Sequence, residues 1–178
     1  MNIWLKEINI DDGPEYCACL LELANYPDAY ARPVPSDFTS EEFESFKNTR
    51  VRMFNGIPER PNIPKTNTYW VMDNEKPIGY ATLKHTVDMT KPGGHFGCCL
   101  KKEYQNKGIG SIVAAKLSQI AYEELGIEEV VYTSKNENLQ SQKSVEKMGG
   151  TLIGIHDGYH FYTINIKEQL EERGKTKW

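Results

Sequence analysis

Apolar residues in the first 27 positions follow first a strand-like and then a helix-like spacing. Residues 3–10 alternate imperfectly between apolar and polar types, which predicts a strand that ends at Asp11-Asp12-Gly13. Pro14 suits the first position of a helix. The apolar positions that follow lie on one helical face as far as Pro27: Cys17, Leu20, Leu21 and Ala24. The pattern therefore predicts a strand followed by a helix.

A second helix and a long loop come next. Thr39 and Glu42 have the spacing of a capping box and predict a helix that carries Phe43, Phe46 and Phe54. Residues 28–37, before this helix, have no regular pattern. Three prolines between Asn55 and Lys65 prevent regular structure there, and loops of this length are often functional.

Strand-like and helix-like segments alternate in the rest of the chain. Residues 68–73 and 77–87 are rich in β-branched and aromatic residues and predict a hairpin, and residues 95–100 are apolar enough for a buried strand. The pattern then predicts a helix from Ile112 to Gly126, a strand at 130–132, a helix from Asn138 to Met148, and a final hairpin of residues 152–155 and 159–166. We expect the charged tail, residues 167–178, to fray.

Composition narrows the class of protein. With 178 residues, a net charge of -4 and a pI near 5.6, the chain suits a single domain, which we place at residues 1–166, and does not suit a nucleic-acid binder. No segment resembles a membrane span or a secretion signal, so we expect a cytoplasmic protein with no membrane partner. The four cysteines lack the spacing of a zinc site or a disulfide scaffold, and we interpret them as reduced thiols in small buried spaces: Cys17, Cys19, Cys98 and Cys99. We expect no metal.

The strongest functional signal is the segment Gln105-Asn106-Lys107-Gly108-Ile109-Gly110-Ser111, which joins an apolar strand to an amphipathic helix. Its two glycines let the backbone approach a ligand closely. The first turn of the helix offers amides without intrahelical partners, at the positive end of the helix dipole. The segment therefore predicts an anion site, although its spacing matches neither the Rossmann glycine pattern nor the nucleotide triphosphate loop.

Gln105-x-x-Gly108-x-Gly110 resembles the pyrophosphate loop of the GNAT family of N-acetyltransferases. Two further stretches resemble a bacterial branch of this family: Gly93 to Gly97 before the loop, and Asn138 to Gly150 after it. The order of predicted elements is similar to the GNAT fold over nearly the whole chain. The resemblance implies an α/β fold with a central, mostly antiparallel twisted sheet of roughly six or seven strands and about four helices, splayed between the fourth and fifth strands.

The resemblance also implies how acetyl-coenzyme A (acetyl-CoA) binds. Its pyrophosphate would lie on the backbone amides of residues 105–111, which are Gln105, Asn106, Lys107, Gly108, Ile109, Gly110 and Ser111. Backbone groups of Cys98 and Leu100 would bind the pantetheine arm as an added strand. Asn138 and Ser141 would contact the arm from the other side, although Asn138 could equally be a plain helix cap.

Acetyl transfer to an amine needs a neutral nucleophile, a polarised thioester and a stabilised leaving thiolate. His95 is the best-placed base, and His85 is a weaker candidate. The alternative is that His95 is a structural histidine satisfied by local hydrogen bonds. The resemblance implies the amide of Leu100 as the oxyanion donor. In many family members a tyrosine on the fourth helix protonates the thiolate, and Val145 stands at the matching position here. Four other tyrosines could substitute for it, or could only pack in the core: Tyr104, Tyr132, Tyr159 and Tyr162.

We therefore expect an N-acetyltransferase that acts on a primary amine of a small molecule, in a chain that could form a homodimer. One alternative is an acetyltransferase that acts on protein N-termini or lysines. Another is an acyl-CoA-binding module without turnover, which the absence of the family tyrosine at Val145 would explain. A Rossmann dehydrogenase has only the strand-loop-helix motif in its favour. Four carboxylates near the irregular segments could attract an ammonium or simply be solvated: Asp28, Asp37, Glu41 and Glu59.

Overall fold

The structure is a computed structural model and describes residues 1–25, 33–57 and 63–175. Its strands form two antiparallel sheets with the spatial orders β1-β2-β3-β4 and β5-β7-β6. The strands are β1 (Ile3–Glu7), β2 (Thr66–Asp73), β3 (Lys76–Lys84), β4 (Phe96–Leu100), β5 (Glu129–Lys135), β6 (Thr151–His156) and β7 (Tyr159–Asn165). The expected mostly antiparallel α/β fold is confirmed, with its strands divided into two sheets at the splay between β4 and β5. A doubly wound parallel Rossmann sheet is excluded.

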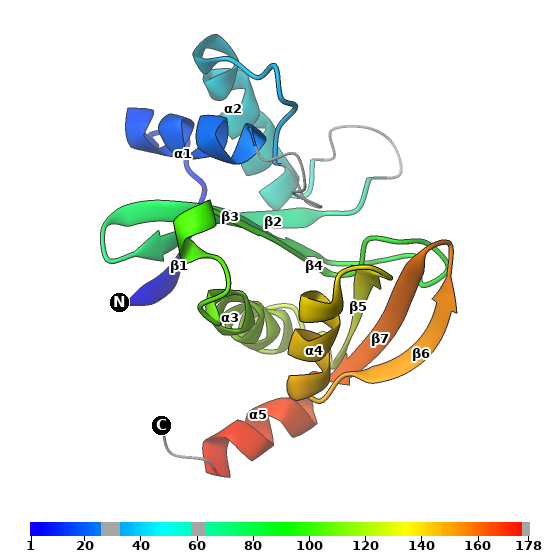
Figure 1. The fold of residues 1–178 in the computed structure, drawn as a ribbon. Helices are drawn as coiled ribbons and strands as arrows, with labels where there is room; N and C mark the ends of the chain where they lie inside the picture. Colours follow the sequence, from blue (N-terminus) through cyan, green and yellow to red (C-terminus); the bar gives the residue numbers. More distant parts are fainter. Residues whose placement is uncertain (26–32, 58–62, 176–178) are drawn as a thin grey trace.

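Helices cover both faces of the first sheet (Figure 1). Helices α1 (Pro14–Ala24) and α2 (Phe43–Phe54) lie on one face, and α3 (Ile109–Glu123) lies on the other. Trp70 and Tyr80 belong to the hydrophobic cluster under α1 and α2, whereas Val71 and Ala81 belong to the cluster on α3. Neighbouring residues of a strand point to opposite faces, so β2 and β3 supply both cores.

The helix starts and the turn that local sequence patterns predict are present in the structure. Pro14 occupies the first turn of α1, and the Thr39–Glu42 capping box opens a 3₁₀ turn, η1 (Ser40–Glu42), that leads into α2. Asn74 has the positive φ of 52° that the β2–β3 turn requires, and β3 ends at Lys84, before the predicted limit. Parts of the irregular segment and of the long loop, residues 28–32 and 58–62, lie outside the described residues.

The two sheets meet where the start of β4 lies against the middle of β5. The amide of His95 donates to the carbonyl of Val131 at 2.8 Å, and the amides of Gly93 and Gly94 donate to Thr133 Oγ1 at 3.0 and 3.3 Å. A Cβ at Gly94 would lie 2.3 Å from the Val131 oxygen, so only glycine permits this contact. Beyond it β4 and β5 diverge without pairing, which opens the space that becomes the site.

The C-terminal segment differs from the expectation that it frays. After β7 the chain forms α5 (Ile166–Lys175). Ile166 is fully buried, Leu170 packs against the core, and Gln169 Nε2 donates to the carbonyl of Met148 at 3.1 Å. These residues share one helical face, so a segment that is mostly charged still has an apolar side for packing. Among the described residues, none of the helices has both the length and the apolar content needed to cross a membrane.

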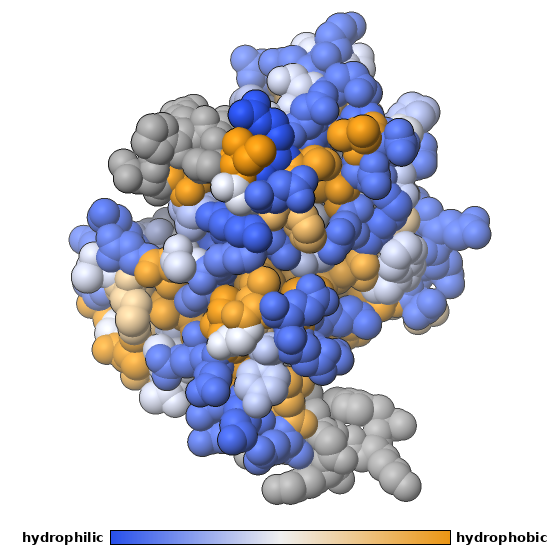
Figure 2. All heavy atoms as spheres, turned by 180° about the vertical axis from the view of Figure 1, so that it is seen from behind, coloured by the Kyte–Doolittle hydropathy of each residue, from blue (hydrophilic) through white to orange (hydrophobic). Residues whose placement is uncertain are grey.

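The surface is mostly polar, with apolar residues between the polar ones. Figure 2 shows this mixture on the face opposite to the view of Figure 1. The edge strand β6 contributes three exposed apolar side chains, Leu152, Ile153 and Ile155. An exposed strand edge is a place where another chain can pair. The homodimer stays a prediction.

Candidate active site

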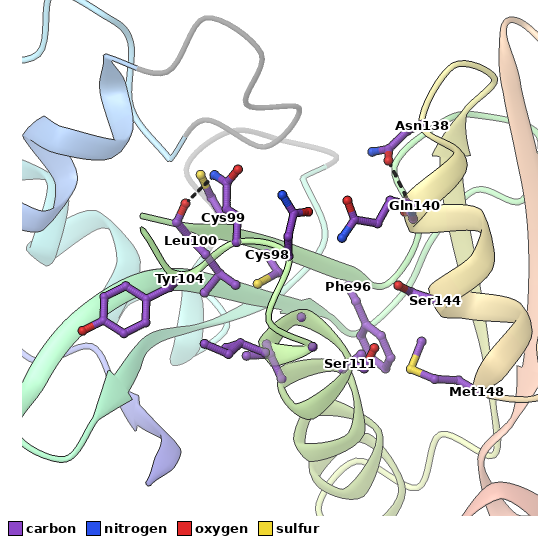
Figure 3. Close-up of a pocket in the computed structure, with 18 of the residues that line it drawn as sticks. Phe96, Cys98, Cys99, Leu100, Tyr104, Ser111, Asn138, Gln140, Ser144 and Met148 are labelled. Atoms are coloured by element: carbon purple, nitrogen blue, oxygen red, sulfur yellow. Dashed lines mark hydrogen bonds between the residues drawn. The ribbon is translucent and has the colours of Figure 1, made fainter. Parts of the chain in front are cut away.

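A cavity of about 510 Å³ lies in the opening between the two sheets. It is lined by β4, the loop that follows it, the N-terminal half of α3, Tyr132 of β5, and the helix α4 (Leu139–Lys147) (Figure 3). The predicted cofactor-binding residues all line it except Lys107, whose exposed ammonium group lies 5.9 Å from the centre of the Tyr104 ring. The structure thus brings together segments more than 30 residues apart in the chain, such as Leu100 and Asn138.

The loop before α3 has the geometry of an anion cradle. Asn106 and Gly108 adopt left-handed backbone conformations, with φ of 59° and 75°. The first helical hydrogen bonds of α3 run from Ser111 and the next amide to the carbonyl of Gly108, which leaves the amides of Ile109 and Gly110 before them. No described side chain caps this helix end. These amides are therefore available to an anion.

The two glycines at this helix end border open space and are not packed against other residues. A Cβ at Gly108 or Gly110 would meet no described atom within 4 Å. The Gln105 side chain has a different role, because its Nε2 donates to the carbonyl of Leu100 at 2.8 Å (Figure 3). Gln105 therefore ties the loop to the end of β4.

One backbone edge of β4 faces the cavity. Lys84 N donates to the carbonyl of His95, and Lys101 N donates to the carbonyl of Ile78, each at 2.9 Å, so the odd-numbered residues of this stretch pair with β3. Backbone groups alternate in direction along a strand, so those of Cys98 and Leu100 point toward the second sheet. An extended ligand can add to such an edge as a further strand.

The opposite wall is formed by α4 and β5. Asn138 Oδ1 accepts a hydrogen bond from the amide of Ser141 at 3.1 Å, which makes Asn138 the N-cap of α4 and leaves its Nδ2 as a donor beside the cavity. The Ser141 hydroxyl lies 3.2 Å from the hydroxyl of Tyr132. Both residues line the cavity together with Cys98 of the opposite wall, and burial raises the pKa of Tyr132 while its hydrogen bond with Ser141 acts in the opposite direction.

Two lining residues of α4 and its C-cap residue were not anticipated from the sequence: Gln140, Ser144 and Met148 (Figure 3). They follow one another at intervals of four, which places them on one face of α4. That spacing is visible in the sequence, but it does not say which face of the helix a ligand meets.

A sequence profile of the acetyltransferase (GNAT) domain matches residues 2–151, which is most of the chain. The chain belongs to the GNAT family. No curated protein shows significant sequence similarity to it.

Solved structures of other acetyltransferases share the fold of this GNAT protein. RimL, a ribosomal L7/L12 alpha-N-protein acetyltransferase in complex with coenzyme A, has a TM-score of 0.71 and 15% identity over 93% of this chain and 94% of its own. The microcin C7 self-immunity acetyltransferase MccE, in complex with acetyl-CoA and AMP, has a TM-score of 0.67 and 18% identity over 92% of each chain. The Campylobacter jejuni N-acetyltransferase PseH, in complex with acetyl coenzyme A, has a TM-score of 0.58 and 14% identity over 92% of this chain and 99% of its own.

In this GNAT protein His95 lies outside the cavity lining and is only 7% exposed. Its Nδ1 accepts a hydrogen bond from the amide of Val131 at 2.9 Å, so its remaining proton lies on Nε2. Burial lowers the pKa of His95, which keeps the ring neutral. His95 therefore joins β4 to β5, and its role as a base stays a prediction. His85 is likewise outside the lining, with Nε2 2.8 Å from Asn67 Oδ1.

Two variants separate these roles of His95. His95→Asn can still accept from the Val131 amide, so we expect parental activity and an unchanged rate-versus-pH profile. His95→Leu leaves that amide buried and unpaired, so we expect a loss of about 1–3 kcal/mol in the free energy of unfolding. A catalytic base would instead make both variants equally inactive.

The pH dependence of stability provides a second measurement on the same residue. The folded-state pKa of His95 lies below its unfolded value, so the unfolded state binds more protons as the pH falls from about 7 to 5. The free energy of unfolding should therefore decrease over this range, and urea titrations should show a shallower decrease for His95→Asn. The slope does not vanish, because burial also lowers the pKa of His85.

One cysteine departs from the expectation that all four fill buried spaces. Cys17, Cys19 and Cys99 are buried, but Cys98 is exposed to the cavity (Figure 3). Its β4 position directs it into the opening, which a local pattern does not reveal. Partial removal of water from the thiol between the cavity walls raises the pKa of Cys98 to about 12, so the thiol stays protonated and is a poor nucleophile.

The remaining chemical groups of the cavity are few. The described lining residues include no carboxylate and no imidazole, and the described residues contain no cluster of histidine, cysteine or acidic side chains suited to a metal. Val145 is fully buried in the core. Of the four candidate tyrosines, only Tyr104 and Tyr132 line the cavity. Burial raises the pKa of Tyr132, so its hydroxyl keeps its proton at neutral pH.

Proposed function

We propose that this GNAT protein transfers the acetyl group of acetyl-CoA to a primary amine of a small molecule. One observation carries the proposal: an anion cradle at a helix N-terminus and an unpaired strand edge border the same cavity. A ligand with a pyrophosphate at one end and an extended amide-bearing arm matches both features. Acetyl-CoA bound in MccE and PseH, two proteins of this fold, supports the assignment.

Each wall of the cavity then has a role in binding. The amides of Ile109 and Gly110 would hold the pyrophosphate. The outward backbone groups of Cys98 and Leu100 would pair with the pantetheine arm, and Asn138 Nδ2 would donate to it from α4.

Residues on β4 and β5, the two strands that border the opening, would supply the chemistry. Acetyl-CoA brings a thioester whose carbonyl must be polarised, and the amide of Leu100 is the candidate donor. The amine nitrogen forms a bond to the carbonyl carbon, and the bond from carbon to sulfur breaks. Tyr132 would then protonate the departing thiolate, taking the place of the family tyrosine that is Val145 here.

Removal of the amine proton does not require a side chain of the described lining. A primary ammonium titrates near pH 10.4, so a small neutral fraction exists at neutral pH, and water can accept the proton. We expect the rate to rise with pH without the inflection that a histidine base produces. The four cysteines are free thiols, which agrees with our proposal of a cytoplasmic location.

Release of free thiol from acetyl-CoA, measured against a panel of amines, tests the function. We expect release that depends on the amine and product masses that increase by one acetyl group. Tight binding of acetyl-CoA with no amine-dependent release would favour the acyl-CoA-binding module. Release with peptides and none with small amines would favour a protein acetyltransferase.

A further inference from the structure

Two lysine ammonium groups lie over the ring of Tyr104, which lines one end of the cavity. Lys76 Nζ is 5.7 Å and Lys107 Nζ is 5.9 Å from the ring centre. The lysines come from different parts of the chain, because Lys76 begins β3 and Lys107 belongs to the loop before α3. Folding therefore gathers two positive charges beside the proposed pyrophosphate site, and the backbone contacts proposed for the pyrophosphate and the arm use neither of them.

The Tyr104 ring gives both ammonium groups a fixed reference point. Tyr104 ends the 3₁₀ turn η2 (Lys102–Tyr104), and its amide donates to the carbonyl of Lys101 at 2.9 Å. Its ring also packs partly against the hydrophobic core. The face of an aromatic ring attracts a cation within about 6 Å of its centre. The two lysine side chains are long and exposed, but the ring holds their charged ends at the border of the cavity.

The protein neutralises little of this positive charge. Glu103 Oε1 lies 3.9 Å from Lys76 Nζ, and both side chains are more than half exposed, so this ion pair is weak. Lys107 takes part in none of the ion pairs between described residues. The described cavity lining contains no carboxylate. This end of the cavity therefore attracts an anion, although the net charge of the whole chain is -4.

The direction of the bound donor assigns this end of the cavity to its nucleotide. In the proposed complex the pyrophosphate lies on the amides of Ile109 and Gly110, and the pantetheine arm extends from there along β4 towards Tyr132 and α4. Figure 3 shows Tyr104 and α4 at opposite ends of the lining. In coenzyme A the pyrophosphate joins the arm to an adenosine whose 3′-hydroxyl carries a third phosphate. The nucleotide therefore leaves the pyrophosphate on the side of Tyr104.

We propose that Lys76 and Lys107, held over Tyr104, bind the 3′-phosphate of coenzyme A. A phosphate monoester carries about -1.5 to -2 charges near neutral pH and has several acceptor oxygens. Lysine binds such a group as a point charge, so two flexible ammonium groups suit it. The inference rests on the proposed function and names its donor class. The donors are thioesters of complete coenzyme A, and thioesters of a phosphopantetheine arm without the 3′-phosphorylated nucleotide bind more weakly.

Calorimetric titrations with acetyl-CoA and with acetyl-dephospho-CoA, which lacks only the 3′-phosphate, test this site. We expect the parent to bind acetyl-CoA at least about 10-fold more tightly. The double variant Lys76→Gln/Lys107→Gln should lose this preference and bind the dephospho compound as the parent does. The control is Lys143→Gln/Lys147→Gln, which removes the same charge from exposed positions of α4 that do not line the cavity. It should retain the preference.

Two further measurements distinguish a charge effect from a difference in shape between the two compounds. The preference should decrease as the salt concentration rises from about 50 to 500 mM, because salt screens exposed charges. Tyr104→Leu should reduce the preference by about 3-fold although both lysines remain, because the ring no longer holds them. Tyr104→Phe keeps an aromatic face and should retain the preference of the parent.

These titrations contain no acceptor, so they keep the 3′-phosphate site separate from the transferase proposal. A preference for acetyl-CoA that Lys76→Gln/Lys107→Gln abolishes, without any amine-dependent thiol release, would retain the site and sink the transferase. Equal affinity of the parent for the two compounds would overturn the site alone. A preference that survives in Lys76→Gln/Lys107→Gln would do the same, because other residues would then bind the phosphate.

Discussion

Gly110→Asp is expected to abolish acetyl-CoA binding and to leave the fold intact. Position 110 lies in the first turn of α3, where an acidic side chain interacts favourably with the helix dipole. A Cβ there meets no described atom within 4 Å, so the substitution should not reduce stability. The new carboxylate would instead occupy the cradle and repel the pyrophosphate. We expect affinity to fall by at least about 100-fold, or roughly 3 kcal/mol.

Calorimetric titration with acetyl-CoA measures this loss, and thermal unfolding without ligand checks the fold. Gly110→Ala is the matched control, because it adds a methyl group and no charge, and we expect it to bind within about 10-fold of the parent. If Gly110→Asp bound acetyl-CoA as the parent does, the pyrophosphate would not lie on α3 and the proposed orientation of the ligand would be wrong.

Tyr132→Phe is expected to lower kcat by about 100-fold and to leave acetyl-CoA affinity nearly unchanged. The variant keeps the ring and loses the hydroxyl that pairs with Ser141. Burial holds the pKa of Tyr132 above its ordinary value, so the hydroxyl is protonated from about pH 6 to 9 and the deficit should be constant over this range. Steady-state kinetics with saturating acetyl-CoA measure it.

Tyr104→Phe is the control for this experiment. Tyr104 lines the same cavity at the phosphate-loop end, away from the junction of β4 and β5, so its hydroxyl has no place in the chemical step. We expect kcat within about 2-fold of the parent. Equal rates for the parent and Tyr132→Phe would mean that the thiolate leaves without Tyr132, which its moderate basicity permits.

The sequence determined the features that depend on residues close together in the chain. Pro14 at the start of α1, the Thr39–Glu42 capping box and the Asn138 cap are set by spacings of a few residues. The phosphate loop is equally local, because glycine freedom and unpaired helix amides arise from consecutive positions. Three such local motifs in order were sufficient to indicate the GNAT family and most elements of its fold.

Only the tertiary structure decided the roles that depend on distant partners. The contact of His95 with Val131, 36 residues away, places this candidate base at the junction of the sheets and outside the cavity lining. Tyr132 is separated from Tyr159 and Tyr162 because it lines the cavity that opens between β4 and β5. The segment that forms α5 is mostly charged, so only the structure shows that Ile166 and Leu170 pack one of its faces against the core.

The cavity makes the same distinction. Consecutive residues set the backbone geometry of the loop before α3, so local spacing was sufficient to predict an anion site there. The other walls come from β4, β5 and α4, which are far apart in the chain, and only long-range packing brings them together around one cavity.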